Sequence, residues 1–205
     1  MKKNPFIGIA GNIGVGKTTF TEIISEHFGW QAYYESVGDN PYLDDFYGDM
    51  GRWSFNLQVY FLQYRFRDQM EIESVNSGVI QDRTIYEDVE IFAKNLYEMN
   101  HMSNRDWQTY HSLFVNMTQF LRMPDLIIYL RASTDTLISR IKNRNRDFEK
   151  NISPEYLHSL NILYDKWINK ISDHNIYIIE TDGFNIFKDD KKLDGFIFDI
   201  HKILT

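Results

Sequence analysis

A glycine-rich segment near the N-terminus has the residue types and spacing of a phosphate-binding loop. Its eight residues satisfy the pattern G-x-x-x-x-G-K-[ST]: Gly11, Asn12, Ile13, Gly14, Val15, Gly16, Lys17 and Thr18. Thr19 follows the pattern directly and is expected to belong to the same site. Glycines let backbone N–H groups approach phosphate oxygens closely, and the N-terminus of the following helix adds positive potential. We expect Lys17 to reach the β- and γ-phosphates and Thr18 to ligate Mg²⁺. The segment therefore predicts a nucleoside triphosphate site.

Acidic and basic side chains stand where two further strands are expected to end. Glu35 ends a predicted strand at 31–35, where a general base facing the γ-phosphate is needed. Asp82 and Arg83 follow a predicted strand at 78–81. Asp82 has the oxygen ligands that suit Mg²⁺, and Arg83 has the charge to steady a phosphate or the carboxylate of the base. These positions predict phosphoryl transfer, although a solvated acid at the end of a strand has the same sequence.

A long aromatic-rich helix, expected at 52–74, carries a mixed polar and aromatic face. The spacing of i, i+3, i+4 and i+7 places Gln58, Phe61, Leu62 and Arg65 together on it. An amide, a ring and a guanidinium can stack on and hydrogen-bond a planar heterocycle. The same stripe is also typical of plain core packing, so the pattern alone leaves both interpretations open.

Positive charge gathers between residues 140 and 150 of an otherwise acidic chain, at Arg140, Lys142, Arg144 and Arg146. One interpretation is a solvated helix face. The other is an arginine-rich lid that closes over the transferring phosphate. The helix expected at 134–143 favours the lid, because its end lies on the same side of the sheet as the phosphate loop.

The elements that must position these residues alternate along the chain. Strands are expected at 6–10, 31–35, 78–81, 125–131 and 176–180, and helices at 20–28, 52–74, 87–99, 105–121, 134–143 and 154–171. Strands separated by helices indicate βαβ units and a parallel sheet. With 205 residues and no linker or repeat, we expect one α/β domain spanning 1–205, with helices on both faces of about five strands.

Composition limits the partners of this domain. The net charge of −7 disfavours generic binding to a nucleic acid polymer or an acidic membrane, and no apolar run is long enough to span a bilayer. The chain has no cysteine, which excludes disulfides and thiolate metal sites and is consistent with a cytoplasmic location. The six histidines lack metal-ligand spacing, and no guanine-binding [NT]-K-x-D or nucleophilic G-x-S-x-G motif is present.

Together these motifs resemble the deoxynucleoside kinase family, most closely its bacterial deoxyadenosine/deoxycytidine kinases. The resemblance covers nearly the whole chain and rests on the phosphate loop and five further motifs: Glu35-Ser36-Val37, Asn40-Pro41-Tyr42-Leu43, Trp53-Ser54-Phe55, Asp82-Arg83-Thr84 and the arginines of R-x-x-x-R-x-R. The family usually has Pro at the position of Ser36, and many members have Glu at that of Asp82. Neither departure removes a required functional group.

The resemblance implies a three-layer P-loop kinase fold with an arginine-rich lid, and ATP and Mg²⁺ as cofactors. It implies that Glu35 accepts the proton of the nucleoside 5′-hydroxyl and that Arg83 orients it. Further implied contacts are Tyr47 and Glu149 to the sugar 3′-hydroxyl, Gln58 with Arg65 and Asp88 to the base, and Arg140, Arg144 and Arg146 to phosphate. Near the C-terminus it implies an ATP adenine contact at Asp182, Gly183 and Phe184, although an ordinary turn has the same sequence. It also implies a homodimer formed through long helices.

The charged pair Arg65 and Asp88 accompanies adenine, cytosine or guanine recognition in the resembled family, so we expect deoxyadenosine first and deoxycytidine or deoxyguanosine next. Two alternatives remain open on the sequence. A thymidylate-kinase-like nucleotide kinase shares the phosphate loop, the Asp-Arg pair and the lid, but Glu35 would repel its substrate's 5′-phosphate. A P-loop regulatory protein would bind nucleotide without needing an acceptor pocket.

Overall fold

The computed structural model describes residues 4–35, 40–149, 152–172 and 174–205. Within these ranges a single parallel sheet has the strand order β2-β3-β1-β4-β5. The strands are β1 (Phe6–Gly11), β2 (Gln31–Tyr33), β3 (Val79–Asp82), β4 (Leu126–Arg131) and β5 (Asn175–Glu180). Because β1 lies at the centre of the sheet, the phosphate loop that follows it opens at the middle of the carboxyl edge.

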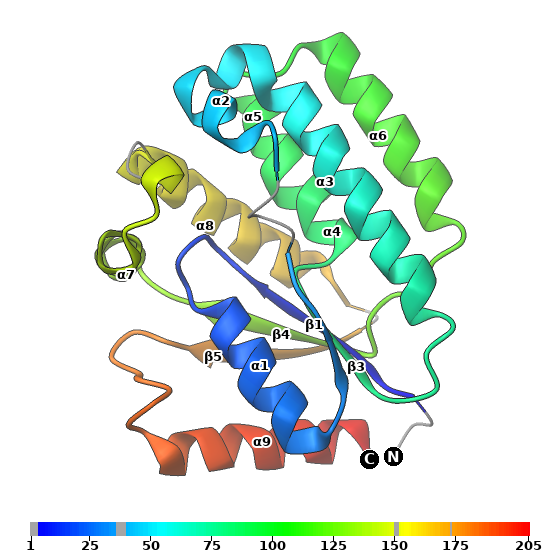
Figure 1. Ribbon diagram of the computed structural model, residues 1–205, viewed down its shortest axis with the longest axis vertical. Helices are drawn as coiled ribbons and strands as arrows, with labels where there is room; N and C mark the ends of the chain where they lie inside the picture. The colour runs from blue at the N-terminus through cyan, green and yellow to red at the C-terminus, as the bar shows by residue number, and fades with distance from the viewer. Residues whose placement is uncertain (1–3, 36–39, 150–151, 173) are drawn as a thin grey trace.

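Helices pack on both faces of the sheet (Figure 1). They are α1 (Lys17–Phe28), α2 (Leu43–Gly48), α3 (Met50–Ile72), α4 (Ile85–Glu87), the π-helix η1 (Asp88–Ala93), α5 (Lys94–Glu98), α6 (Asn104–Thr118), α7 (Thr134–Arg144), the 3₁₀-helix η2 (Asp147–Glu149), α8 (Pro154–Lys170) and α9 (Asp190–Leu204). Helices α1 and α9 cover one face, and α3, α6 and α8 lie on the other side (Figure 1). The predicted three-layer α/β architecture is confirmed.

Two apolar cores explain why the central strands are almost wholly apolar. Ile7 and Ile9 of β1 face the core shared with α1, α7 and α9, whereas Ile127 and Tyr129 of β4 face the core under α3, α6 and α8. Strands covered on both faces need apolar side chains at successive positions, and each buried aliphatic side chain contributes roughly 1.5–3 kcal/mol. The sheet is therefore a rigid base for the loops at its carboxyl edge.

The observed elements correct the expected ones in three places. The strand expected at 31–35 ends at Tyr33, because this edge strand pairs only with β3 and only through Gln31–Tyr33. The helix expected at 87–99 begins at Ile85 and contains the π-helix η1. Helices α2 and α9 were not predicted. Ser153 is the N-cap of α8, since its Oγ accepts from Tyr156 N at 3.1 Å.

In the described ranges, every helix is too short or too polar to cross a lipid bilayer.

Candidate active site

The phosphate loop joins β1 to α1 as predicted, and three of its glycines, Gly11, Gly14 and Gly16, have positive φ. Gly14 has φ +82°, and a Cβ there would lie 2.7 Å from Ile141 Cγ1 of α7, so the backbone passes directly under that helix. Gly16 has φ +105° and is the N-cap of α1. Lys17 folds back over the loop and donates from Nζ to Asn12 O at 3.1 Å. Burial and the nearby Arg83 lower the pKa of Lys17 to about 8.

The side chain of Asn12 anchors the loop to α8. Asn12 Nδ2 donates to Leu157 O at 2.9 Å and to Asn161 Oδ1 at 2.8 Å, and Asn12 Oδ1 accepts from Ile13 N at 2.7 Å. Asn161 in turn donates to Ala132 O at 3.0 Å, just beyond β4. Asn12 was predicted among the nucleotide-binding residues, which stays a prediction; its side chain makes this structural bridge.

Thr18 and Asp82 lie together below the loop, in a geometry that fits Mg²⁺. Thr18 Oγ1 donates to Asp82 Oδ2 at 2.7 Å. Asp82 is the last residue of β3 rather than the first after it, and its other oxygen, Oδ1, is buried with no hydrogen-bond partner among the described residues. A carboxylate oxygen without a partner next to a hydroxyl supplies the hard oxygen ligands that Mg²⁺ prefers beside phosphate.

Glu35 is held by two arginines at the centre of the site. Glu35 Oε1 accepts from Arg65 Nη2 at 2.7 Å and from Arg83 Nη1 at 3.1 Å. Burial by itself would raise the pKa of Glu35, but the positive charges of Arg83, Arg65 and Lys17 outweigh it and lower the pKa to about 2. Glu35 is therefore ionised throughout the physiological pH range. The residues that follow it, Ser36 and Val37 of the predicted motif, lie outside the described residues.

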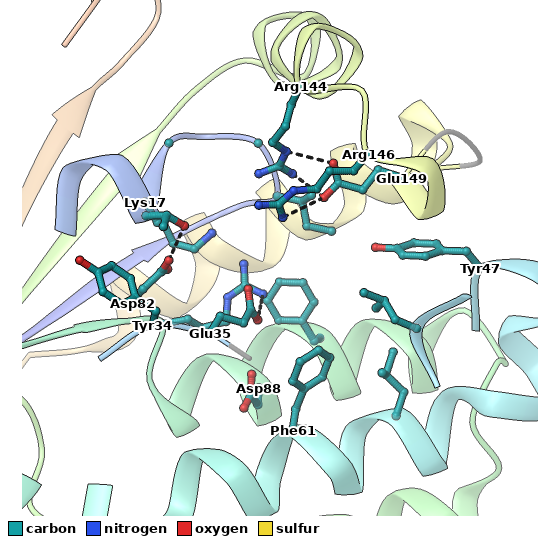
Figure 2. Close-up of a pocket in the computed structure, with 18 of the residues that line it drawn as sticks. Lys17, Tyr34, Glu35, Tyr47, Phe61, Asp82, Asp88, Arg144, Arg146 and Glu149 are labelled. Carbon is teal, nitrogen blue, oxygen red and sulfur yellow. Dashed lines mark hydrogen bonds and ion pairs between the residues drawn. The ribbon is translucent and has the colours of Figure 1, made fainter. Parts of the chain in front are cut away.

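A cavity of about 530 Å³ joins the phosphate loop to Glu35 and to α3. Among the predicted site residues, its lining includes Ile13, Gly14, Gly16, Lys17, Thr18, Thr19, Glu35, Tyr47, Gln58, Phe61, Asp82, Arg83, Asp88, Arg140, Arg144, Arg146 and Glu149. Figure 2 shows Lys17 and Asp82 toward one end of the cavity and Tyr47 toward the other, with Glu35 between them. The volume is in the range of small-molecule sites.

At the floor of the cavity, Gln58 and Asp88 are buried polar groups that face the space. Gln58 Oε1 has no hydrogen-bond partner among the described residues. Asp88 Oδ2 accepts from Arg65 Nε at 3.0 Å, and burial raises the pKa of Asp88 to about 6 in spite of that arginine. Arg65 does not line the cavity. It lies behind Glu35 and Asp88 and also donates to Asp82 O at 3.1 Å, so it holds the two carboxylates in place.

The arginines after α7 meet Glu149 of η2. Arg144 makes a two-point contact with the Glu149 carboxylate, including Nε to Oε2 at 3.1 Å, and Arg146 Nη1 lies 3.8 Å from Glu149 Oε1 (Figure 2). Tyr47 faces the same space, and its pKa is raised by burial and by the negative charge of Glu149 among others. The predicted lid and the predicted sugar contacts are thus neighbours.

A second cavity of about 260 Å³ lies beside the phosphate loop and is lined by Val15, Thr19, Arg140, Thr181 and Phe184 among others. Arg140 donates to Val15 O at 2.9 Å and to Thr181 O at 2.6 Å, and so ties the loop to the turn after β5. Asp182 is not among the residues that line this cavity and accepts from Ser133 N at 3.0 Å, while Gly183 has φ +67° in the turn.

The sequence model described as "Deoxynucleoside kinase" matches residues 7–205 of the chain. The chain belongs to the deoxynucleoside kinase family. It is 36% identical to a deoxyadenosine/deoxycytidine kinase of Bacillus subtilis, over 98% of this chain and 94% of that protein. It is 46% identical to a deoxyadenosine kinase of Dictyostelium discoideum, over 81% of this chain and 67% of that one.

Solved structures agree with this membership. A deoxyadenosine kinase from M. mycoides with bound products dCMP and dCDP superposes with a TM-score of 0.84 at 31% identity, covering 95% of this chain and 99% of that one. The same M. mycoides kinase has also been solved with bound dATP, with a TM-score of 0.83, 31% identity and coverage of 94% and 98%. Family membership favours a deoxynucleoside kinase over a thymidylate-kinase-like nucleotide kinase and over a P-loop regulatory protein. The structural matches confirm the predicted P-loop kinase fold.

Several residues of this deoxynucleoside kinase site were not identified from the sequence. Tyr34, Phe92 and Tyr156 line the main cavity, and the Arg83 guanidinium lies 4.1 Å above the Phe92 ring. Glu87, fully buried, joins the phosphate loop to the Asp-Arg segment. The spacing of Thr84 and Glu87 is that of a helix capping box, a signal that marks Glu87 as a structural partner at the edge of the site.

Proposed function

We propose that this chain transfers the γ-phosphoryl group of ATP to the 5′-hydroxyl of a deoxynucleoside, with deoxyadenosine as the preferred acceptor, in nucleotide salvage. The observation that carries the proposal is the ionised Glu35, held by Arg65 and Arg83 in one cavity with Lys17 of the phosphate loop. A general base and a phosphate cation facing the same space are what in-line transfer to a hydroxyl requires.

On the donor side, the loop N–H groups and Lys17 bind the β- and γ-phosphates. Thr18 and Asp82 would hold Mg²⁺, which supplies charge neutralisation between these phosphates when bound. Arg144 and Arg146 belong to the lid, and binding of the triphosphate draws them from Glu149 toward the γ-phosphate. The ATP adenine occupies the second cavity, against Phe184.

On the acceptor side, Glu35 takes the proton of the 5′-hydroxyl as the new bond to phosphorus forms. A carboxylate whose pKa is about 2 is a weak base in the ground state, so the proton moves late, when phosphoryl transfer has made the hydroxyl acidic. Arg83 and Arg65 keep the carboxylate oriented throughout. Arg83 also lines the main cavity, where its guanidinium would stabilise the charge that develops on the reacting groups.

Recognition of the nucleoside uses both ends of the main cavity. Tyr47 and Glu149 bind the sugar 3′-hydroxyl once Arg144 has moved. The carboxylate of Asp88 and the amide of Gln58 accept and donate hydrogen bonds along the edge of an aminated base, with Phe61 against its face. Thymine offers no exocyclic amino group to Asp88, so the carboxylate would lose its water and keep its bond to Arg65 without gaining that donor, which supports selection against thymidine.

The decisive experiment measures ATP consumption with the four common deoxynucleosides and their monophosphates. We expect the highest kcat/KM with deoxyadenosine, lower values with deoxycytidine or deoxyguanosine, and little turnover with thymidine. The same assay tests the base with Glu35→Gln, and Glu98→Gln, a matched change at an exposed residue of α5, is its control. Preference for thymidine would overturn the specificity, and turnover with monophosphates alone would overturn the proposed acceptor.

We further propose a cytoplasmic homodimer built on α3 and α6, which lie side by side (Figure 1). These helices expose apolar side chains, with Met70, Leu113 and Val115 each 40–45% accessible. Apolar side chains grouped on two long neighbouring helices support burial against a second copy. Sedimentation velocity tests this: we expect a dimer that Val115→Asp weakens, and a monomer of the unmodified chain at micromolar concentration would exclude it.

A further inference from the structure

Glu87 is a fully buried acid that binds three segments of the chain at once. Its Oε1 accepts from Thr84 N at 3.0 Å, and its Oε2 accepts from Gly11 N at 3.2 Å. The same Oε2 lies 2.8 Å from the phenol oxygen of Tyr164 on α8. Glu87 therefore joins the start of the phosphate loop, the segment that carries Asp82 and Arg83, and α8.

If Glu87 is ionised, this cluster has one proton too few for each of its short oxygen–oxygen contacts to be a hydrogen bond. The Tyr164 oxygen lies 2.8 Å from Gly11 O as well as 2.8 Å from Glu87 Oε2, and a phenol has a single proton to donate. With Glu87 ionised, one of these two oxygen–oxygen contacts has no proton between its atoms. With a proton on Oε2, Glu87 donates to Tyr164 and Tyr164 donates to Gly11 O. Both short contacts are then hydrogen bonds, and a lone pair on Oε2 still accepts from Gly11 N.

The charges around Glu87 agree with an uncharged carboxyl group. The nearest cation is Arg83, whose Nε lies 4.0 Å from Oε2 and whose Nη1 is already bound to Glu35 at 3.1 Å. Lys17 on α1 and the acid Asp88 on the adjoining turn are the other charged groups that act on it. Burial raises the pKa of Glu87, and the opposing effects of Arg83 and Lys17 are smaller. A buried carboxylate whose nearest cation is 4.0 Å away and is shared with Glu35 is costly, whereas the acid form is not.

The bonds of Glu87 are made to backbone groups whose placement matters for phosphoryl transfer. Arg83 has a left-handed backbone, with φ +66°, a conformation that costs free energy in a non-glycine residue. The bond from Thr84 N to Glu87 fixes the peptide directly after it. Gly11 O also accepts from Arg83 Nη2 at 3.3 Å, so the two peptide groups on either side of the Gly11 Cα are bound, one by Glu87 and the other by Tyr164 and Arg83.

We propose that Glu87 is an uncharged positioning residue that holds the start of the phosphate loop and Arg83 in register for phosphoryl transfer. The carboxyl proton is held on Oε2 between Glu87 and Tyr164. Glu87 touches neither substrate in this role and acts through Gly11 and Arg83. The inference uses the proposed reaction only for its kinetic readout.

Infrared spectroscopy tests the protonation directly. The C=O stretch of a carboxylic acid is well separated from the bands of a carboxylate, so the difference spectrum between the unmodified chain and Glu87→Gln at pH 7 isolates this residue. We expect an acid band that is lost in Glu87→Gln and kept in Glu90→Gln, a matched change in the adjoining π-helix. Loss of carboxylate bands instead would overturn the proton assignment.

Steady-state kinetics test the positioning. We expect Glu87→Ala to lower kcat on the order of 10²-fold with less than about threefold change in the deoxynucleoside KM, because a shift of the loop and Arg83 misaligns the reacting groups. Glu87→Gln keeps a neutral side chain that donates to Tyr164, and we expect its kcat within about tenfold of the unmodified chain.

Tyr164→Phe removes the shared phenol and carries the kinetic test if Glu87→Ala does not fold; we expect its kcat to fall about tenfold. Folding is checked by circular dichroism and the thermal midpoint. An unchanged kcat in folded Glu87→Ala would overturn the positioning role. If Glu87→Ala does not fold, an unchanged kcat in Tyr164→Phe would overturn it. Absence of any nucleoside-dependent turnover in the unmodified chain would instead count against the proposed reaction, and the infrared result would stand.

Discussion

Replacing Glu35 by glutamine removes the proposed base and keeps the size of the side chain. In the folded protein, Glu35 Oε1 accepts hydrogen bonds from Arg65 and Arg83, and glutamine can still accept with its one amide oxygen. Arg65 keeps its bond to Asp88, and Arg83 keeps its bond to Gly11 O. The substitution therefore removes a negative charge and a proton acceptor while leaving the surrounding contacts in place.

Two magnitudes follow for Glu35→Gln. General base catalysis contributes about 10²–10⁴-fold, so kcat should fall by that factor with little change in nucleoside KM. The pKa of Glu35 is about 2 in the folded protein and 4.5 ordinarily, which corresponds to roughly 3 kcal/mol of stabilisation at pH 7 as an upper bound. Because the folded pKa is the lower one, this stabilisation is fully present above pH 4.5 and is lost as the pH falls toward 2.

The assay is nucleoside-dependent ATP consumption together with denaturant unfolding at several pH values, with Glu98→Gln as the control. We expect the difference in unfolding free energy between Glu35→Gln and the unmodified chain to shrink below pH 4.5. We also expect kcat of the unmodified chain to show no acid limb from Glu35 above pH 4. A folded Glu35→Gln variant with the full kcat would refute the assignment of the base.

Three further predictions concern charged groups of the same site. Lys17 has a pKa of about 8 and is proposed to bind phosphate as a cation, so ATP binding at pH 8 should take up a fraction of a proton, measured by calorimetry in buffers of different ionisation enthalpy; buffer-independent heats would contradict this. Asp88 has a pKa of about 6, so the deoxyadenosine KM should rise as the pH falls from 7 to 5, roughly tenfold per pH unit well below 6, and Asp88→Asn should remove that dependence. Arg144→Ala should lower kcat by about 10²–10³ if Arg144 reaches the transferring phosphate. A change confined to the nucleoside KM would mean that Arg144 serves only Glu149.

The phosphate loop, the parallel sheet and the main helices could be predicted because their signals are local. The glycine pattern around Lys17 needs only the strand before it and the helix after it, and apolar runs mark buried strands wherever they lie. Helix α9 was not predicted, although Ile197, Ile200 and Leu204 with charged residues between them have the spacing of an amphipathic helix.

The partners of the charged residues could not be predicted, because they depend on how distant segments meet. Helical spacing places Gln58 and Arg65 on one face, yet Gln58 reaches the cavity while Arg65 is buried behind two carboxylates. The spacing of Arg140 and Arg144 likewise says nothing about their acceptors. Arg140 binds backbone carbonyls of two loops, and Arg144 binds Glu149.

These pairings explain how an acidic protein can bind a triphosphate without a general affinity for polyanions. Before any ligand arrives, Arg65 and Arg83 are bound to Glu35, and Arg144 is bound to Glu149, so these cations are neutralised within the site. Lys17 donates only to a backbone carbonyl among its described hydrogen bonds, and its lowered pKa makes the site less positive still. A ligand that binds one of these arginines must therefore displace the carboxylate that the arginine already binds. In the proposed reaction the ATP phosphates would compensate Lys17 and Arg144, and the 3′-hydroxyl of the acceptor would compensate Glu149, so selectivity follows from pairing within the site rather than from net charge.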